Sequence, residues 1–328
     1  VQLWGDCPIA KEAIFSISSA NFDEAFNALF PARKPIVEVY AQIIADCQVA
    51  IQKAPDASNK FKANKMAANA LLAKVYATMP NPDWTKVNQY CDIVIGGGYT
   101  LLPTFDHLFD NAHEGNSESI WEINGDGWGS PIGAWNTFMF LGTDWKKFNA
   151  PSHTLVKAYA NNNDKQRVAS TITRANVGWA DTYWSSTNYP FCYKMRDTNG
   201  NQNFYIARLA DILLLKAAAL ANKGDITGAM SQVNIIRTRA GIASISASNQ
   251  SDAFNKILEE RLMELAFEGD RWFDLKRMGK AIEFLSKQKD GNGNLLPYAS
   301  NINQNRLLWP IPQDKLDANA LLTQNPGY

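Results

Sequence analysis

The sequence has few cysteines and histidines, and neither residue type is spaced as a common metal or redox motif requires. The four cysteines stand far apart without a CxxC pair, which excludes a zinc ribbon and a thioredoxin-like redox site. The three histidines, His107, His113 and His153, form no HExxH or other metal spacing, so we predict no metal site. No GxSxG or GxxxxGK segment is present either, so the signatures of serine hydrolases and P-loop proteins are missing.

An excess of charge of one sign is also missing. Lys plus Arg and Asp plus Glu number 32 each, which argues against a nucleic-acid binder and against adhesion to acidic lipid by bulk charge. No apolar run reaches membrane-spanning length, and no signal peptide opens the chain. The chain is instead rich in large rings, with ten Trp and eleven Tyr, and its 46% of apolar residues suffice for a sizeable core.

Much of the chain carries the apolar spacing of amphipathic helices. Consecutive helices are separated by turns that contain Pro or Gly, and the small residues Ala217 and Ala229 stand where two of them meet. This layout resembles tetratricopeptide repeats, in which stacked helix pairs bury each other's faces. We predict an all-α fold of tetratricopeptide-like helix pairs, with helices at 36–53, 59–79, 84–95, 206–222 and 226–239.

The periodicity weakens in the middle of the chain, where more than half of the Trp residues lie among many Asn, Gly, Ser and Thr. One helix is predicted there, near 152–160, and the remainder is expected to be loops with short strands. Loops held on a rigid frame are where binding usually occurs. We divide the chain into a helical part at 1–110, an irregular ligand-binding segment at 111–205 and a C-terminal helical part at 206–328, all within one structural domain.

The aromatic residues of the middle segment are candidates for a binding site. Indole and phenol rings stack on the apolar C–H faces of sugars, while neighbouring amides and carboxylates bind sugar hydroxyls. The alternative is that the rings pack the segment onto the helical frame, since Trp is mostly buried on average. We expect at least two of the rings to face a ligand. The predicted ligand-binding residues are Trp179, Tyr183, Trp184, Trp128, Trp135 and Asn136.

A charged stretch at 260–279 joins two further apolar stripes. Gly269 is placed to end the first helix, and Asp270 to begin a second that runs to Leu285. Acidic and basic residues alternate along this corner. They are either catalytic or fix the crossing of two helices, and we favour the second interpretation because such ion-pair networks are common in structural corners.

Two smaller features also have competing interpretations. The segment 290–294, Asp-Gly-Asn-Gly-Asn, resembles the start of a calcium loop, but it lacks the required Gly and Glu, so a tight polar turn is favoured. Cys47 and Cys91 fall on apolar helix faces, where a free thiol behaves as a small buried hydrophobe. We therefore predict no disulfide.

Five parts of the chain, in order, resemble the SusD/RagB family, glycan-capturing lipoproteins of the Bacteroidetes outer membrane. The Trp4-Gly5-Asp6-Cys7-Pro8-Ile9 turn is similar to the family's Gly-Asp-Val-Pro turn, with Cys7 in place of Val. The other similar parts are 194–197 with 207–214, 234–241, 260–279, and 309–312 with 322–328.

The resemblance implies a non-catalytic, surface-exposed outer-membrane lipoprotein for nutrient uptake. Such a protein captures an oligosaccharide and passes it to a TonB-dependent SusC-like transporter, without a cofactor. Because the Gly5-Asp6-Cys7-Pro8 turn resembles an interior element of the family, we expect the native protein to be longer and to carry its lipid anchor further upstream. Three alternatives stay open: peptide capture as by RagB-like members, a protein-binding repeat scaffold, and a glycoside hydrolase using carboxylates such as Asp126 and Asp181.

Overall fold

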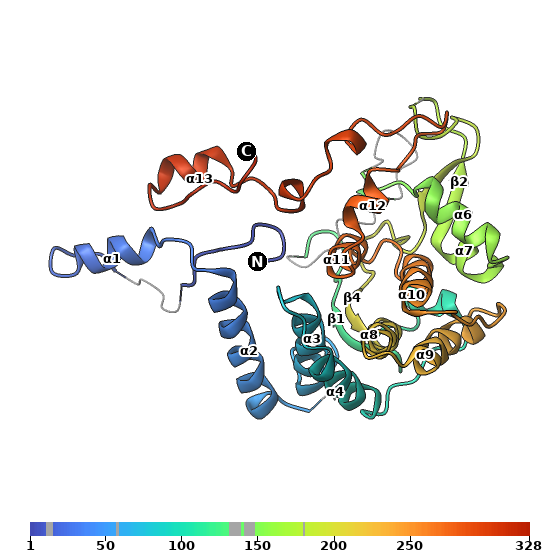
Figure 1. Ribbon diagram of the computed structural model, residues 1–328, viewed down its shortest axis with the longest axis horizontal. Helices are drawn as coiled ribbons and strands as arrows, with labels where there is room; N and C mark the ends of the chain where they lie inside the picture. The colour runs from blue at the N-terminus through green and yellow to red at the C-terminus, as the bar shows by residue number, and fades with distance from the viewer. Residues whose placement is uncertain (11–15, 57–58, 131–138, 141–147, 180) are drawn as a thin grey trace.

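The computed structural model describes residues 1–10, 16–56, 59–130, 139–140, 148–179 and 181–328. These residues form an all-α helical-repeat fold with two small two-stranded sheets (Figure 1). The helices are α1 (Phe22–Leu29), α2 (Ile36–Lys53), α3 (Lys65–Thr78), α4 (Trp84–Ile95), α6 (His153–Asn161), α7 (Lys165–Thr171), α8 (Leu209–Asn222), α9 (Ile226–Arg239), α10 (Gln250–Glu264), α11 (Arg271–Arg277), α12 (Ala281–Leu285) and α13 (Gln313–Ala318). The strands are β1 (Ser119–Ile123), β2 (Ile172–Ala175), β3 (Tyr189–Cys192) and β4 (Phe204–Arg208), and short 3₁₀ turns are η1 (Phe105–Phe109), η2 (Ala299–Asn301) and η3 (Asn305–Leu307).

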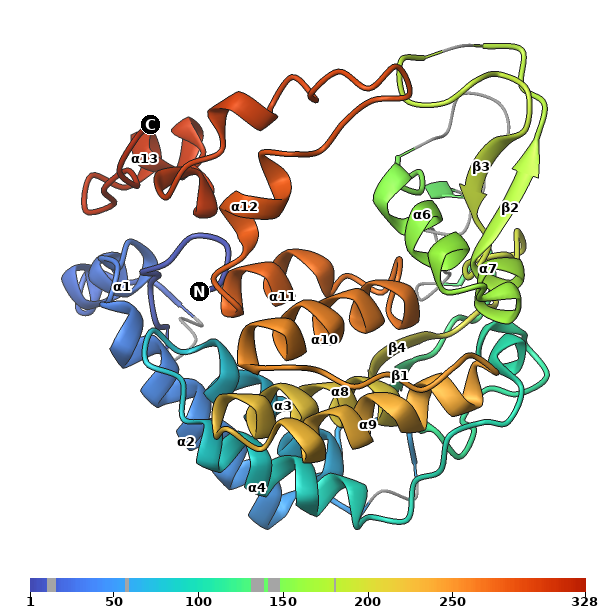
Figure 2. The ribbon, with the colours of Figure 1, turned by 45° about the vertical axis from the view of Figure 1, so that its right-hand side comes forward.

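The predicted helix pairs are confirmed. Helices α2, α4 and α9 have the predicted bounds, whereas α3 begins only at Lys65, because the Asn64 side chain accepts a hydrogen bond from the backbone N–H of Ala67 and caps the helix there. Helix α8 begins at Leu209 because the residues before it form β4. Helices α3 and α4 pack together, as do α8 and α9, and α4 packs on α8 (Figure 2).

Small residues allow the helix pairs to approach closely. Ala217 and Ala229 are fully buried between α8 and α9, as predicted. Cys91 is fully buried in the core shared by α3, α4 and α8, and Cys47 is nearly so. This burial confirms the prediction that Cys47 and Cys91 act as buried apolar residues, and all four cysteines are free thiols. In the described part of the chain, no helix is long and apolar enough to cross a lipid bilayer.

The middle segment begins and ends at one small sheet. Strands β1 and β4 pair antiparallel, with Glu122 opposite Tyr205. Ile120 of β1 and Ala207 just before α8 join the core that α3, α4 and α8 share, so we propose that the three parts of the chain form one structural domain. In the described part of the segment, α6 and the short strands agree with the prediction, and β2 and β3 form a hairpin in which Thr173 lies opposite Phe191. Helix α7 and the turn η1 were not predicted.

The corner after α10 differs from the prediction in two respects. Helix α10 ends at Glu264, five residues before the predicted end at Gly269, and the chain then forms a turn in which Phe267 has a positive φ of 67°. The sequence favoured a single helix from Asp270 to Leu285, but α11 ends at Arg277 and α12 starts at Ala281. Gly279 has a φ of 65°, a left-handed conformation that glycine adopts at little cost and that ends a helix. The chain therefore changes direction where the apolar spacing alone predicted continuity.

The charges of this corner lie inside the protein. Glu264 is fully buried, and its carboxylate accepts hydrogen bonds from Arg208 at 2.6 Å, from Arg167 at 3.0 Å and from Arg239. Arg208 also donates to Glu118 at 2.8 Å and to Glu268 at 2.7 Å. Burial by itself raises the pKa of Glu264, but the surrounding arginines hold that pKa well below its usual range.

A second set of buried charges continues this network. Asp211 of α8 pairs with Lys74 of α3 at 2.6 Å and with Arg261 of α10 at 2.7 Å, and Arg261 also pairs with Asp274 of α11 at 2.7 Å. We call the two sets together the buried charge network. Its members come from segments that are far apart in the sequence, and they join six helices: α3, α7, α8, α9, α10 and α11. Because they are buried and paired, they support the structural interpretation of the charged corner.

The two ends of the chain lie side by side. The side-chain amide of Asn325 donates to the carbonyl oxygens of Trp4 at 3.1 Å and Trp309 at 2.7 Å, and its oxygen accepts from Arg33 at 2.7 Å. The carboxylate of Asp6 accepts from the backbone N–H of Ile36 at 2.7 Å, at the start of α2. The first and last motif segments therefore form one joint structure.

Candidate functional site

The best candidate site is an exposed aromatic surface beside α6, on the loop that joins β2 to β3. We define the aromatic surface as Trp179, Tyr183 and Trp184 of that loop together with Tyr298, which follows the polar turn at 290–294. Tyr183 and Tyr298 are each 42% exposed, whereas Trp179 and Trp184 are half-buried. Exposed large rings held by a rigid frame are suited to ligand contact.

Trp184 is held in place by neighbouring groups. Its ring stacks on His153 of α6, with the ring centroids 3.7 Å apart, and its indole N–H donates to the carbonyl oxygen of Pro151 at 2.8 Å. The Nε2 atom of His153 lies 2.6 Å from the carbonyl oxygen of Tyr183 and donates to it. The guanidinium of Arg174 lies 5.8 Å from the centroid of the Trp184 ring. These contacts fix the orientation of Trp184 before any ligand arrives.

The loop itself is shaped by Asp181. One carboxylate oxygen of Asp181 accepts from the backbone N–H groups of Tyr183 at 2.8 Å and Trp184 at 3.0 Å, which forms a tight turn. The other oxygen accepts from the hydroxyl of Tyr189 at 2.8 Å. Asp181 therefore presents Tyr183 and Trp184 as neighbours on a fixed backbone.

The polar turn at 290–294 docks onto this loop. The backbone N–H of Gly291 donates to the carbonyl oxygen of Thr182 at 3.0 Å, and a Cβ atom at Gly291 would lie only 2.7 Å from the carbonyl oxygen of Tyr183. Only glycine permits so close an approach. The Asp290 carboxylate accepts from the backbone N–H groups of Asn292 and Asn294, each at 2.9 Å, which is the tight polar turn that the sequence favoured.

The structure brings together only some of the predicted binding residues. Trp179, Tyr183 and Trp184 share one loop, but Trp179 packs edge-on against Tyr189 at 4.6 Å between ring centroids. Trp128 is 44% exposed and sits on another loop pair, where its indole N–H donates to the carbonyl oxygen of Thr198 at 2.6 Å. Trp135 and Asn136 lie outside the described residues.

One member of the aromatic surface, Tyr298, and two residues that contact Trp184, His153 and Arg174, were not predicted from the sequence. Burial, and to a smaller degree the nearby Tyr183, raises the pKa of Tyr298, so its hydroxyl stays protonated near neutral pH. The sequence signal for Tyr298 is indirect. That signal is the glycine-rich turn at 290–294, just before Tyr298, because Gly291 of this turn is needed for contact with the aromatic loop.

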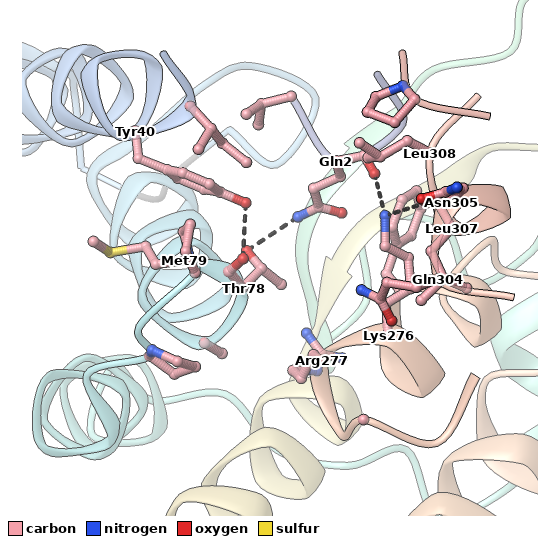
Figure 3. Close-up of a pocket in the computed structure, with 18 residues that line it drawn as sticks. Gln2, Tyr40, Thr78, Met79, Lys276, Arg277, Gln304, Asn305, Leu307 and Leu308 are labelled. Carbon is pink, nitrogen blue, oxygen red and sulfur yellow. Dashed lines mark hydrogen bonds between the residues drawn. The ribbon is translucent and has the colours of Figure 1, made fainter. Parts of the chain in front are cut away.

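A cavity of about 600 Å³ elsewhere in the molecule is a weaker candidate (Figure 3). It lies between the end of α3 and the C-terminal segment, and its polar groups are largely paired with one another. Gln2 donates to the hydroxyl of Thr78 at 3.1 Å, and Lys276 donates to the carbonyl oxygens of Gln2 at 2.6 Å and Leu307 at 2.8 Å. These bonds tie the ends of the chain to the helices, so we assign the cavity a structural role.

Comparisons with known proteins place this chain in a family. The sequence model that describes the SusD family matches residues 134–328 of this chain. SusD-like protein P2 of Formosa agariphila is 31% identical over 377 residues, an alignment that covers 100% of this chain and 71% of the relative.

Solved structures agree with this match. A SusD superfamily protein from Bacteroides vulgatus superposes with a TM-score of 0.77 at 23% identity and covers 100% of this chain and 74% of that protein. A laminarin-binding SusD-like protein superposes with a TM-score of 0.75 at 25% identity, again over 100% of this chain and 75% of the other. The match to the family model over more than half of the sequence, and the relative aligned along all of it, show that this chain belongs to the SusD family.

Proposed function

We propose that this protein captures a neutral oligosaccharide on its aromatic surface and leaves it intact. The observation that carries the proposal is that Tyr183 and Trp184 are neighbours held rigidly on one loop. Tyr183 is exposed and Trp184 is half-buried. A fixed pair of rings matches the repeated C–H faces of a glycan chain and loses little conformational entropy on binding.

Polar groups around the rings suit sugar hydroxyls. Thr182 precedes Tyr183 in the chain, and Asn292 and Asn294 belong to the turn whose Gly291 docks on Thr182. All three are exposed, and they offer hydroxyl and amide groups without net charge. The equal numbers of acidic and basic residues in the whole chain also favour a neutral ligand over a charged one. Because one similar structure binds laminarin, we propose β-glucans of that type as the first ligands to test.

Binding without chemistry is supported by the state of the carboxylates. Asp181, the acid nearest the rings, already accepts hydrogen bonds from two backbone N–H groups and one tyrosine hydroxyl, so its role is to shape the loop. Of the acids of the charged corner, Glu260, Glu264 and Asp274 are buried in ion pairs. The partly buried Glu268 and Asp270 are paired with Arg208 and Lys74. A glycosidase needs two accessible carboxylates that flank the scissile bond.

The test of capture without cleavage is incubation with a panel of neutral polysaccharides, including laminarin, and with unstructured peptides. We expect affinity electrophoresis to show retardation by at least one glycan, and a reducing-end assay after prolonged incubation to show no increase. New reducing ends would make the protein a hydrolase, and binding of the peptides alone would replace the glycan proposal with peptide capture.

We also propose that the native protein is a surface-exposed lipoprotein of the outer membrane that hands its glycan to a TonB-dependent SusC-like transporter. Membership in the SusD family supports this role. Affinity purification of the protein expressed from its own gene, in a detergent that preserves outer-membrane barrels, should recover such a transporter. Recovery of the protein alone under these conditions would count against the partnership.

A further inference from the structure

We propose that His107, Asp110 and His113 form a binding site for a zinc ion, on the loop that leads from η1 into β1. One ligand atom from each of these side chains lies within 4.8 Å of the others. Among the residues that the structure describes, this is the only such group of three His, Cys, Asp or Glu side chains. Two of the three histidines of the chain are thus together, although their spacing matches none of the common metal motifs.

The backbone that carries the three side chains is fixed. One carboxylate oxygen of Asp110 accepts from the backbone N–H groups of Ala112 at 3.0 Å and His113 at 2.9 Å. The amide of Asn116 donates to the carbonyl oxygen of His113 at 2.9 Å and to the hydroxyl of Tyr205 at 2.7 Å. His107 lies in η1, whose Phe105, Leu108 and Phe109 are buried. A metal site gains affinity when its ligands are held in this way before the ion binds.

The side chains already lie close to the spacing that zinc requires. The imidazole rings of His107 and His113 are parallel within 6°, with their centroids 3.9 Å apart. The Nδ1 atom of His113 lies 2.7 Å and 3.0 Å from the two carboxylate oxygens of Asp110. Zinc bonds of about 2.0–2.1 Å in a tetrahedron place neighbouring ligand atoms roughly 3.3 Å apart. Because parallel rings direct their nitrogen lone pairs side by side, we expect one imidazole to rotate when zinc binds, with water in the remaining position.

The surroundings favour a cation. Two further carboxylates lie beside this loop: Asp197 accepts a hydrogen bond from the side chain of Asn111 at 2.6 Å, and Glu122 accepts one from the backbone N–H of Gly115 at 3.1 Å. The nearby cation Arg196 is engaged, since it pairs with Asp106 at 2.8 Å and donates to the carbonyl oxygen of Phe109 at 3.0 Å. Two imidazoles and one carboxylate form a donor set that suits zinc and disfavours Ca²⁺ and Mg²⁺, which require oxygen ligands.

The experiment is calorimetric titration of chelator-treated protein with zinc chloride, beside a melting curve with and without zinc. The intact protein should bind one equivalent and melt at a higher temperature with zinc, because the ion binds the folded state. His107→Gln and His113→Gln should each weaken binding about tenfold or more. Asp110→Asn should do the same while keeping the oxygen that accepts the two backbone N–H groups of the turn.

His153→Gln is the matched control, because His153 is the remaining histidine and lies on the aromatic surface instead. It should bind zinc as the intact protein does. Melting curves without zinc show whether each variant is folded. The proposal is overturned if the intact protein binds no zinc, or if folded His107→Gln and His113→Gln variants bind it unchanged, which would mean adventitious binding elsewhere.

Discussion

Replacement of Glu264 by alanine is expected to lower the free energy of unfolding by about 3–5 kcal/mol, the usual cost of removing one partner from a buried ion-pair network. Glu264 is fully buried between Arg167, Arg208 and Arg239, so its removal leaves three almost completely buried cations without this partner. Urea denaturation followed by circular dichroism measures the change.

The matched control is Glu259→Ala, on the same helix but exposed, where its carboxylate accepts a hydrogen bond from the side chain of Asn162. This control should shift the free energy of unfolding by about 1 kcal/mol or less, as exposed polar contacts do. Equal stability of Glu264→Ala and Glu259→Ala would contradict the structural role of the buried charge network.

The same network predicts acid sensitivity. The pKa of Glu264 and that of Glu268 are lowered in the folded protein, because paired cations outweigh the effect of burial. Groups of this kind contribute stability that is fully present above the unfolded-state pKa of about 4.3 and is lost as the pH falls toward the folded-state pKa. The urea midpoint should therefore fall steeply below about pH 4, and less steeply in Glu264→Ala.

Replacement of Tyr183 or Trp184 by alanine is the second large expected effect. Each change should weaken glycan binding by about 1 kcal/mol or more, and the double variant should show no measurable binding, because both sides of the stacking platform are then lost. Tyr183 is the cleaner position, since its side chain is exposed, whereas Trp184 also stacks on His153. Calorimetric titration with the glycan found in the panel measures the loss.

Phe22→Ala serves as the control for this pair. Phe22 is 56% exposed on α1, at the opposite end of the molecule from α6 (Figure 1). Its loss should leave glycan affinity unchanged. Melting temperatures separate binding from folding: if Tyr183→Ala and Trp184→Ala are as stable as the intact protein and still bind normally, the glycan site lies elsewhere.

The helical frame was largely predictable because apolar spacing and capping residues are local signals. Helices α2, α4 and α9 follow directly from the apolar periodicity and from Pro, Asp and Gly residues at their ends. The prediction was wrong at two places in particular. At Gly279 a left-handed backbone conformation ends a helix that the apolar spacing continues. At 206–208 the first residues of a predicted helix belong instead to β4, which pairs with the distant strand β1.

The buried charge network and the candidate site both depend on contacts between residues far apart in the sequence, which no local pattern reveals. The carboxylate of Glu264 meets arginines from α7, β4 and α9, and spacing within one helix does not reveal which cations it pairs with. In the same way, the segment that carries Tyr298 is joined to the aromatic loop by the hydrogen bond from Gly291 to Thr182, two residues that are far apart in the sequence. Residue type suggested sugar contact at Tyr183 and Trp184, whereas the position of Tyr298 and His153 required the fold.

The most direct test of the proposed capture site is a crystal structure of the protein with a bound oligosaccharide from the panel, laminarin fragments first. We predict that a sugar ring lies against Tyr183 and Trp184, with its hydroxyl groups within hydrogen-bond distance of the polar turn at 290–294. A glycan bound in the cavity beside Thr78 and Lys276, or at Trp128 with the aromatic surface empty, would contradict this assignment.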